Sequence, residues 1–124
     1  MRHKSKTLTE QELEIMKVVW AKQTATVRDV YETLLLQRKI AYTTVMTMMK
    51  ILEKKGYLKK QLRDRAYLYR PTEPQSVVLR KMVREFIRHV FNGSAEPLLA
   101  HLVEDRSISE KELQELMRLV RKQS

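Results

Sequence analysis

The segment from Ile40 to Leu58 constrains the fold more than any other part of this chain. Its apolar residues recur at the spacing of a helix that packs one side against a core: Val45, Met48, Met49 and Leu52. The opposite side carries short hydroxyls followed by cations: Thr43, Thr47, Lys50 and Lys54. A helix that enters a DNA groove needs short side chains near base edges and positive charge near phosphates.

The residues after this helix indicate the fold. We expect the helix to run from Thr43 to Lys55 and to end at Gly56 as a left-handed cap. Two strands are predicted next, Tyr57–Gln61 and Ala66–Arg70, joined by the polar turn Leu62–Arg65. A helix, a glycine stop and a basic hairpin in this order are typical of a winged helix-turn-helix.

Two further helices are predicted before this segment. Thr9 with Glu12, and Thr26 with Asp29, carry the spacing of an N-terminal cap. The first helix has its apolar stripe at Leu13, Met16, Val19 and Trp20, and the second at Val27, Val30, Tyr31, Leu34 and Leu35. Residues 1–7 are expected to form a polar arm, and residues 23–26 a turn.

The C-terminal part is predicted to form three helices. The first begins near Pro74 and ends at about Phe91, the second is capped by Ser94, and Ser109 with Glu112 caps the third. We therefore expect a mainly α chain: a winged helix-turn-helix of three helices and a hairpin wing over residues 1–72, and a helical dimerisation region over residues 73–124.

Charge separates the two parts. Residues 1–72 hold 16 of the 25 Lys and Arg and 7 of the 15 Asp and Glu, a net charge of +9, while residues 73–124 carry +1. A basic surface suits a polyanion because each neutralised phosphate releases counterions. The alternative is that basic surface only keeps the protein in solution.

The predicted DNA-contacting residues lie on the third helix and in the turn of the hairpin: Tyr42, Thr43, Thr44, Met46, Thr47, Lys50, Lys54, Arg63 and Arg65. The alternative for the helix is a solvated face, but β-branched Thr on an exposed helix lowers helix propensity and gains no stability. For Met46, packing in the core and contact with a thymine methyl both stay open. The alternative for the two arginines is an ordinary charged turn.

The C-terminal helices carry regular apolar stripes. Because 52 residues in three helices bury little by themselves, we expect these residues to meet a second copy of the chain. The predicted dimerisation residues are Met82, Phe86, Leu98, Leu99, Leu102, Leu113, Leu116, Met117 and Val120. The alternative is an internal core of the same helices.

Composition argues against several other classes. The chain has no cysteine, its histidines at 3, 89 and 101 lack the spacing of metal ligands, and two glycines allow no glycine-rich phosphate loop. No catalytic constellation is evident, so we expect neither an enzyme nor a cofactor or metal site. No apolar run approaches the length of a membrane span, and no signal peptide is apparent, which favours the cytoplasm.

Several segments resemble the penicillinase-repressor family, of the BlaI, MecI and CopY type. They are residues 41–47 (AYTTVMT), 52–58 (LEKKGYL) and 67–69 (YLY), with weaker likeness at residues 8–16, 19–20 and 109–116. The resemblance implies a dimeric winged-helix repressor that binds a palindromic operator in double-stranded DNA. It also implies a link to antibiotic resistance, since a membrane-bound sensor protease that responds to β-lactams removes some members.

The resemblance also places a candidate cleavage site. In the β-lactam repressors the cleaved Asn–Phe bond precedes Val-Glu, and the corresponding residues here are His101 and Leu102, before Val103 and Glu104. Other members release DNA when copper binds C-terminal cysteines. This chain has no cysteine, so this mechanism of release is not expected here. Two alternatives to such a repressor are a winged-helix module that binds protein and a ligand-responsive repressor of the multidrug type.

Overall fold

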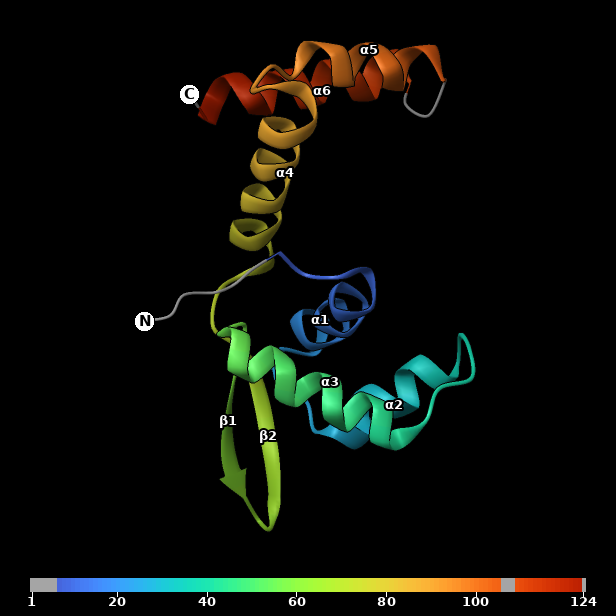
Figure 1. Cartoon of the computed structure of the whole chain (residues 1–124), viewed down its shortest axis with the longest axis vertical. Coiled ribbons are helices and arrows are strands. Elements are labelled where there is room, and N and C mark those ends of the chain that lie inside the picture. The colour runs from blue at the N-terminus through green and yellow to red at the C-terminus, as the bar shows by residue number, and fades with distance from the viewer. Residues whose placement is uncertain (1–6, 106–108, 124) are drawn as a thin grey trace. The chain divides into compact units, whose positions relative to one another are not determined.

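The structure is a computed structural model that describes residues 7–105 and 109–123, with side chains described as far as Glu115 and at Arg118. It divides into two compact units, Met1–Leu79 and Arg80–Ser124. The element order is α1 (Glu10–Lys22), α2 (Val27–Leu35), α3 (Tyr42–Lys55), β1 (Leu58–Arg63), β2 (Ala66–Pro71), α4 (Gln75–Phe91), α5 (Glu96–Glu104) and α6 (Glu110–Gln123) (Figure 1). This is the predicted mainly helical winged helix.

The first two helices begin as the sequence predicts. In α1 the Thr9 hydroxyl accepts the backbone N–H of Glu12 at 3.1 Å, and the Glu12 carboxylate accepts that of Thr9 at 2.9 Å. Thr26 and Asp29 form the same reciprocal pair at the start of α2, with the same two distances. Each pair satisfies two backbone donors that the helix itself leaves unpaired.

The core of the N-terminal unit lies between the three helices and the hairpin. Its largest fully buried side chains come from the helices and from the first strand: Ile15, Met16, Val19, Val30, Leu34, Val45, Met49, Leu52 and Leu58. Of the residues in the three predicted apolar stripes, Leu13, Val27, Tyr31 and Met48 are only partly buried, and Leu35 is 42% exposed. Ile15, 1% exposed, was not predicted to be in the core.

The hairpin is longer than predicted and its turn is tighter. Pairing extends to Arg63 and Ala66, so Leu62 belongs to β1 and only Asp64 and Arg65 form the turn. Both turn residues have positive φ, 50° and 72°. This backbone matches the right-handed twist of the flanking strands in two-residue hairpins. The four-residue turn predicted from composition was therefore wrong.

The segment between α1 and α2 is more than a turn. Ala25 is fully buried and exchanges two backbone hydrogen bonds with Tyr69 of β2, at 2.9 and 2.8 Å. A second anchor lies where β2 ends, because the Thr72 hydroxyl donates to the carbonyl of Gly56 at 2.7 Å. These bonds fix the hairpin to the helices.

The C-terminal unit contains most of α4, with α5 and α6. Ser109 and Glu112 form the predicted reciprocal cap at 3.1 and 2.9 Å. The predicted Ser94 cap is wrong: Ala95 precedes α5, and no side chain caps that helix. Among the described residues of this unit, none is buried, and Val83, Phe86, Val90 and Val103 are about half exposed. No helix in the described part of the chain is long and apolar enough to cross a membrane.

Candidate nucleic-acid interface

The outer side of α3 presents the predicted polar face. Val45, Met49 and Leu52 turn into the core, so the residues on the opposite side of the helix stay exposed. All the predicted polar residues of α3 are on this side: Thr43, Thr44, Thr47, Lys50 and Lys54. We refer to these five residues as the Thr/Lys face.

Two methionines flank the Thr/Lys face. Met48 is partly exposed and lines a shallow hollow of about 260 Å³ together with Thr43, Thr44 and Thr47. Met46 is also partly buried, so the structure leaves it at the edge between core and surface. The hollow therefore exposes hydroxyl groups and one apolar side chain to a ligand that binds at α3.

The start of α3 is held by α2 through an aromatic contact. The rings of Tyr31 and Tyr42 meet edge to face with centroids 5.4 Å apart, and the Arg28 guanidinium carbon lies 5.8 Å from the centroid of the Tyr42 ring. Ala41 precedes the helix and supplies no side-chain cap, while its carbonyl accepts the backbone N–H of Thr44 at 3.1 Å. The backbone N–H groups of Tyr42 and Thr43, at the very start of α3, are therefore the ones positioned for an external acceptor.

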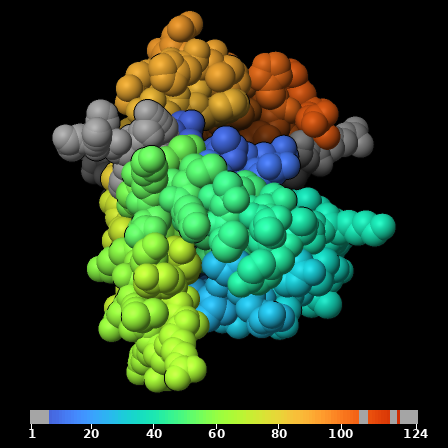
Figure 2. Space-filling model, turned by 60° about the horizontal axis from the view of Figure 1, so that its bottom comes forward, coloured from blue at the N-terminus to red at the C-terminus, as the bar shows by residue number. Residues whose placement is uncertain are grey.

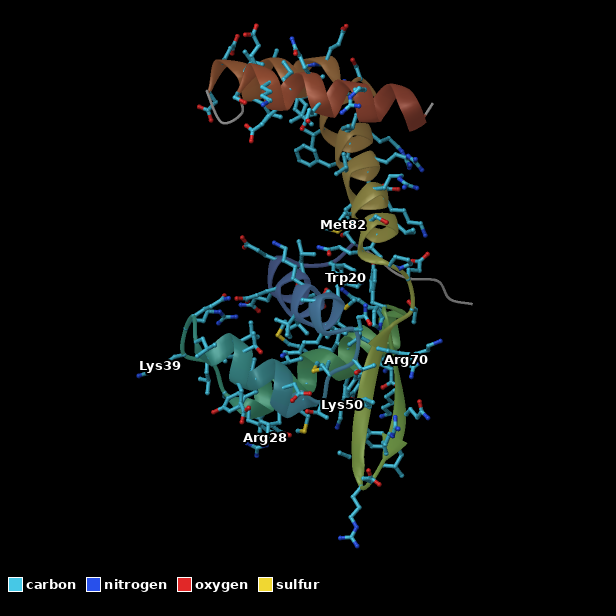
Figure 3. The ribbon with its side chains drawn as sticks, turned by 180° about the vertical axis from the view of Figure 1, so that it is seen from behind. Trp20, Arg28, Lys39, Lys50, Arg70 and Met82 are labelled. Atoms are coloured by element: carbon cyan, nitrogen blue, oxygen red, sulfur yellow. The ribbon has the colours of Figure 1, made fainter. Side chains whose placement is uncertain are left out.

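Arg28 is a candidate site residue that the sequence analysis missed. It lies in the first turn of α2, and in Figure 3 it and Lys50 lie on the side of the unit toward which the turn of the hairpin points. In a helix-turn-helix the helix before the recognition helix crosses the DNA backbone. An exposed Arg in the first turn of that helix was the available signal.

The hairpin carries Arg63 and Arg65 at its far end, where both are exposed. Figure 2 shows the hairpin beside α3 on one face of the N-terminal unit. Nearer the core, the cross-strand pair Leu62 and Tyr67 is also exposed. The structure thus places the two predicted parts of the interface, α3 and the turn, on the same face.

Lysines near this face divide into paired and unpaired ones. Lys55 pairs with Glu12 at 2.7 Å, and Lys60 pairs with Glu53 at 3.4 Å while its ammonium lies 4.4 Å from the centroid of the Tyr67 ring. Among the described residues, no acid pairs with the remaining cations at the exposed side of α3 and in the outer hairpin: Lys50, Lys54, Lys59, Arg63 and Arg65. Positive charge without an internal partner is available to phosphates.

Glu12 is the one buried charged residue in the described part of this unit. Burial alone would raise its pKa, but the hydrogen bonds from Lys55 and from Thr9 outweigh burial, and the pKa of Glu12 lies below its ordinary value of 4.5. Glu12 is therefore ionised at neutral pH, and Lys55 forms an ion pair with it inside the fold.

The predicted dimerisation residues occupy the C-terminal unit. Met82, Leu98, Leu99, Leu102 and Leu113 are partly buried and Phe86 is 48% exposed, while the side chains of Leu116, Met117 and Val120 lie outside the described residues. His101 is exposed, and its ring centroid is 6.2 Å from that of Phe91. The bond between His101 and Leu102 lies inside α5. No cluster of potential metal ligands occurs among the described residues.

Comparison with known proteins decides the family. A family model described as "Penicillinase repressor" matches residues 8–122. The chain belongs to this family. MecI of Mammaliicoccus sciuri is 26% identical over 98% of this chain and 99% of its own length, and the penicillinase repressor of Bacillus licheniformis is 26% identical over 91% and 88%.

Solved structures agree with this assignment. The DNA-binding domain of the repressor BlaI is 29% identical, with a TM-score of 0.54 over 60% of this chain and 92% of that domain. A MarR structure from E. coli is 13% identical with a TM-score of 0.55, a likeness of fold alone. This member of the penicillinase repressor family is thus a DNA-binding transcriptional repressor of the BlaI and MecI type and not an enzyme.

Proposed function

We propose that this repressor binds a two-fold symmetric operator as a dimer, with one winged helix on each half-site. In each copy α3 enters the major groove, and Thr43, Thr44 and Thr47 face base edges. Lys50, Lys54 and the arginines of the hairpin contact phosphates. One observation carries this proposal. Lys55 and Lys60 pair with acids of the same unit, whereas the cations of the Thr/Lys face and of the hairpin turn pair with no acid in the part of the chain that the structure describes.

A solved complex of a relative supports one domain per half-site. The monomeric form of Bacillus licheniformis BlaI has been solved in complex with the blaP half-operator, and that chain is 29% identical to this one with a TM-score of 0.51. The match covers 60% of this chain, about the extent of the N-terminal unit. The family assignment favours this proposal over a winged-helix module that binds only protein.

The test begins with genomic fragments in a gel shift, followed by footprinting to define the operator. Thr47→Val removes one hydroxyl and keeps a β-branched side chain, and we expect it to weaken operator binding by about five-fold. Lys50→Ala should weaken binding about ten-fold and lower the slope of log K against log salt by about one for each copy of the chain.

Lys111→Ala is the matched control for Lys50→Ala. Lys111 is an exposed cation on α6, outside the proposed DNA interface, and its loss changes net charge by the same amount. We expect nearly unchanged operator binding. Equal losses from the two variants would show that net charge alone drives binding, and would contradict the proposed contacts.

Dimerisation is proposed through the C-terminal unit. Its support is that apolar side chains such as Phe86 and Val90 stay about half exposed among the described residues. Phe86→Glu should shift the chain to monomer in sedimentation velocity and leave the melting of the N-terminal unit unchanged. Arg84→Gln, which alters net charge by the same amount at an exposed position of α4, is the control. Monomeric wild-type protein at the concentration of the assay contradicts this part of the proposal.

Release from DNA is proposed to occur by proteolysis between Ala100 and Val103. Proteases bind extended chain, so α5 must unwind first, and none of its residues is buried within a single chain. Co-expression with a membrane sensor protease encoded beside the gene, followed by mass measurement, tests this. An intact chain under inducing conditions contradicts it, and Leu102→Pro should alter the rate of cleavage at this bond.

A further inference from the structure

A groove runs along α1 on a different side of the N-terminal unit from the Thr/Lys face. It has a volume of about 930 Å³ and is bounded by α1, the end of α2 and the residues after α2. Its apolar lining is Leu13, Val18, Ala21 and Leu34. In Figure 3, α1 lies at the edge of the unit opposite Arg28 and Lys50. DNA on α3 would therefore leave the groove accessible.

The charges along this side of α1 are ordered. Glu10 and Glu14 line the groove at the N-terminal half of the helix, and Lys17 and Lys22 line it at the C-terminal half. A second α1 laid antiparallel across a two-fold axis brings acids opposite bases at both ends. A parallel arrangement brings like charges together. The pattern is thus complementary to itself in one orientation only.

The outermost charges carry most of this complementarity. Glu14 already accepts two hydrogen bonds from Arg38 of its own chain, at 2.7 and 3.4 Å, which neutralises it. Glu10 and Lys22 form no ion pair with any described residue. Both are exposed, so both are available to a second copy.

We propose that the α1 groove is a contact between two copies of this chain, formed by antiparallel α1 helices with Glu10 of each copy opposite Lys22 of the other. One short helix buries little area, so the contact is weak for free protein and becomes effective when copies are held close together, as on neighbouring sites of one DNA molecule. It is separate from dimerisation through the C-terminal unit.

Sedimentation equilibrium of the full chain without DNA, at low salt and rising concentration, measures the contact. We expect an association step beyond the dimer that high salt weakens. Glu10→Lys and Lys22→Glu each break two symmetric pairs and should each weaken that step about ten-fold. The double variant Glu10→Lys with Lys22→Glu restores opposite charges and should recover wild-type association.

Glu96→Lys is the matched control, since Glu96 opens α5 as Glu10 opens α1 and both are acids in the first turn of a helix. It should leave the step beyond the dimer unchanged, with melting curves confirming that every variant folds. Absence in wild type of any association step that depends on Glu10 and Lys22, or a double variant that fails to restore it, overturns the proposal. If only one association step exists and it depends on Glu10 and Lys22, the groove contact holds and the proposed C-terminal dimer fails.

Discussion

Oε1 of Glu12 lies 2.7 Å from Nζ of Lys55, and the same oxygen accepts the backbone N–H of Thr9 at 2.9 Å. One buried carboxylate oxygen thus joins the first turn of α1 to the last turn of α3. Lys55 directly precedes Gly56, whose φ of 93° ends α3 and starts the path into β1. The Glu12–Lys55 pair therefore holds the end of the proposed recognition helix against the rest of the fold.

Loss of Lys55 should destabilise the protein without a specific loss of DNA contacts. Lys55→Met leaves the Glu12 carboxylate buried without its cation, and we expect the free energy of unfolding to fall by about 2 kcal/mol in urea titrations. Lys54→Met, one residue earlier on the exposed side, should change stability by less than about 0.5 kcal/mol and weaken operator binding instead. Similar stability losses from both variants would refute the distinction between the two lysines.

Lowering the pH should reduce the free energy of unfolding, because it protonates the Glu12 carboxylate. The folded-state pKa of Glu12 lies below its ordinary value of 4.5, so the ionised carboxylate stabilises the fold above that pH. The stabilisation is lost as pH falls from 4.5 through the folded pKa, because the unfolded chain then takes up more protons. Urea midpoints measured at neutral pH and in this acid range should show the decline.

Glu12→Gln isolates that contribution. A glutamine still closes the cap with Thr9, since Gln can take this position of a capping box. The variant should be less stable than wild type at neutral pH and should lose less stability in acid. Part of the decline remains in the variant, because the hydrogen bond from Arg38 also holds the pKa of Glu14 below 4.5. An acid decline as steep as that of wild type would exclude Glu12 as a source.

The charge and the backbone conformation of Arg65, in the turn of the hairpin, can be tested separately. Arg65 has a φ of 72°, a conformation that glycine adopts without steric cost. Arg65→Gly should keep or raise the free energy of unfolding, by up to about 1 kcal/mol, while it weakens operator binding and lowers the salt slope by about one for each chain. Arg65→Lys should keep most of the binding. A glycine variant that binds with the wild-type salt dependence would remove Arg65 from the interface.

Local signals explain which parts of the fold could be predicted from the sequence. The Thr9 and Thr26 caps, the apolar spacing of α3 and the stop at Gly56 depend on residues a few positions apart. Two of the errors arose where distant residues decide. Ala25 pairs with Tyr69 of β2, and the Asp64–Arg65 turn depends on the register of the whole hairpin. Neither the pairing of Ala25 with Tyr69 nor the register of the hairpin can be predicted from adjacent residues in the sequence.

The candidate site shows the same division. The exposed Thr/Lys face could be predicted from helical spacing, because Val45, Met49 and Leu52 fix which side is buried. The role of each individual cation could not be predicted from the sequence. Lys54 and Lys55 are neighbours of identical type, and only the position of Glu12, 43 residues before Lys55, makes one of them structural.

Arg28 provides a strong test of the interface, because it lies outside the set of contacts predicted from the sequence. Its guanidinium lies over the Tyr42 ring at 5.8 Å and pairs with Glu32 at 3.5 Å on an exposed surface, where such a pair contributes little stability. Arg28→Gln should therefore leave the melting temperature nearly unchanged. Binding should weaken by about five-fold to ten-fold, equally for operator and unrelated DNA, as expected for a phosphate contact. Wild-type affinity and salt slope in Arg28→Gln would place the first turn of α2 outside the interface.

The variant Tyr42→Phe tests the aromatic neighbour of Arg28, because it keeps the ring against Tyr31 and removes only the hydroxyl. Unchanged operator binding would assign Tyr42 to positioning α3. Weakened operator binding would assign its hydroxyl to a contact with DNA.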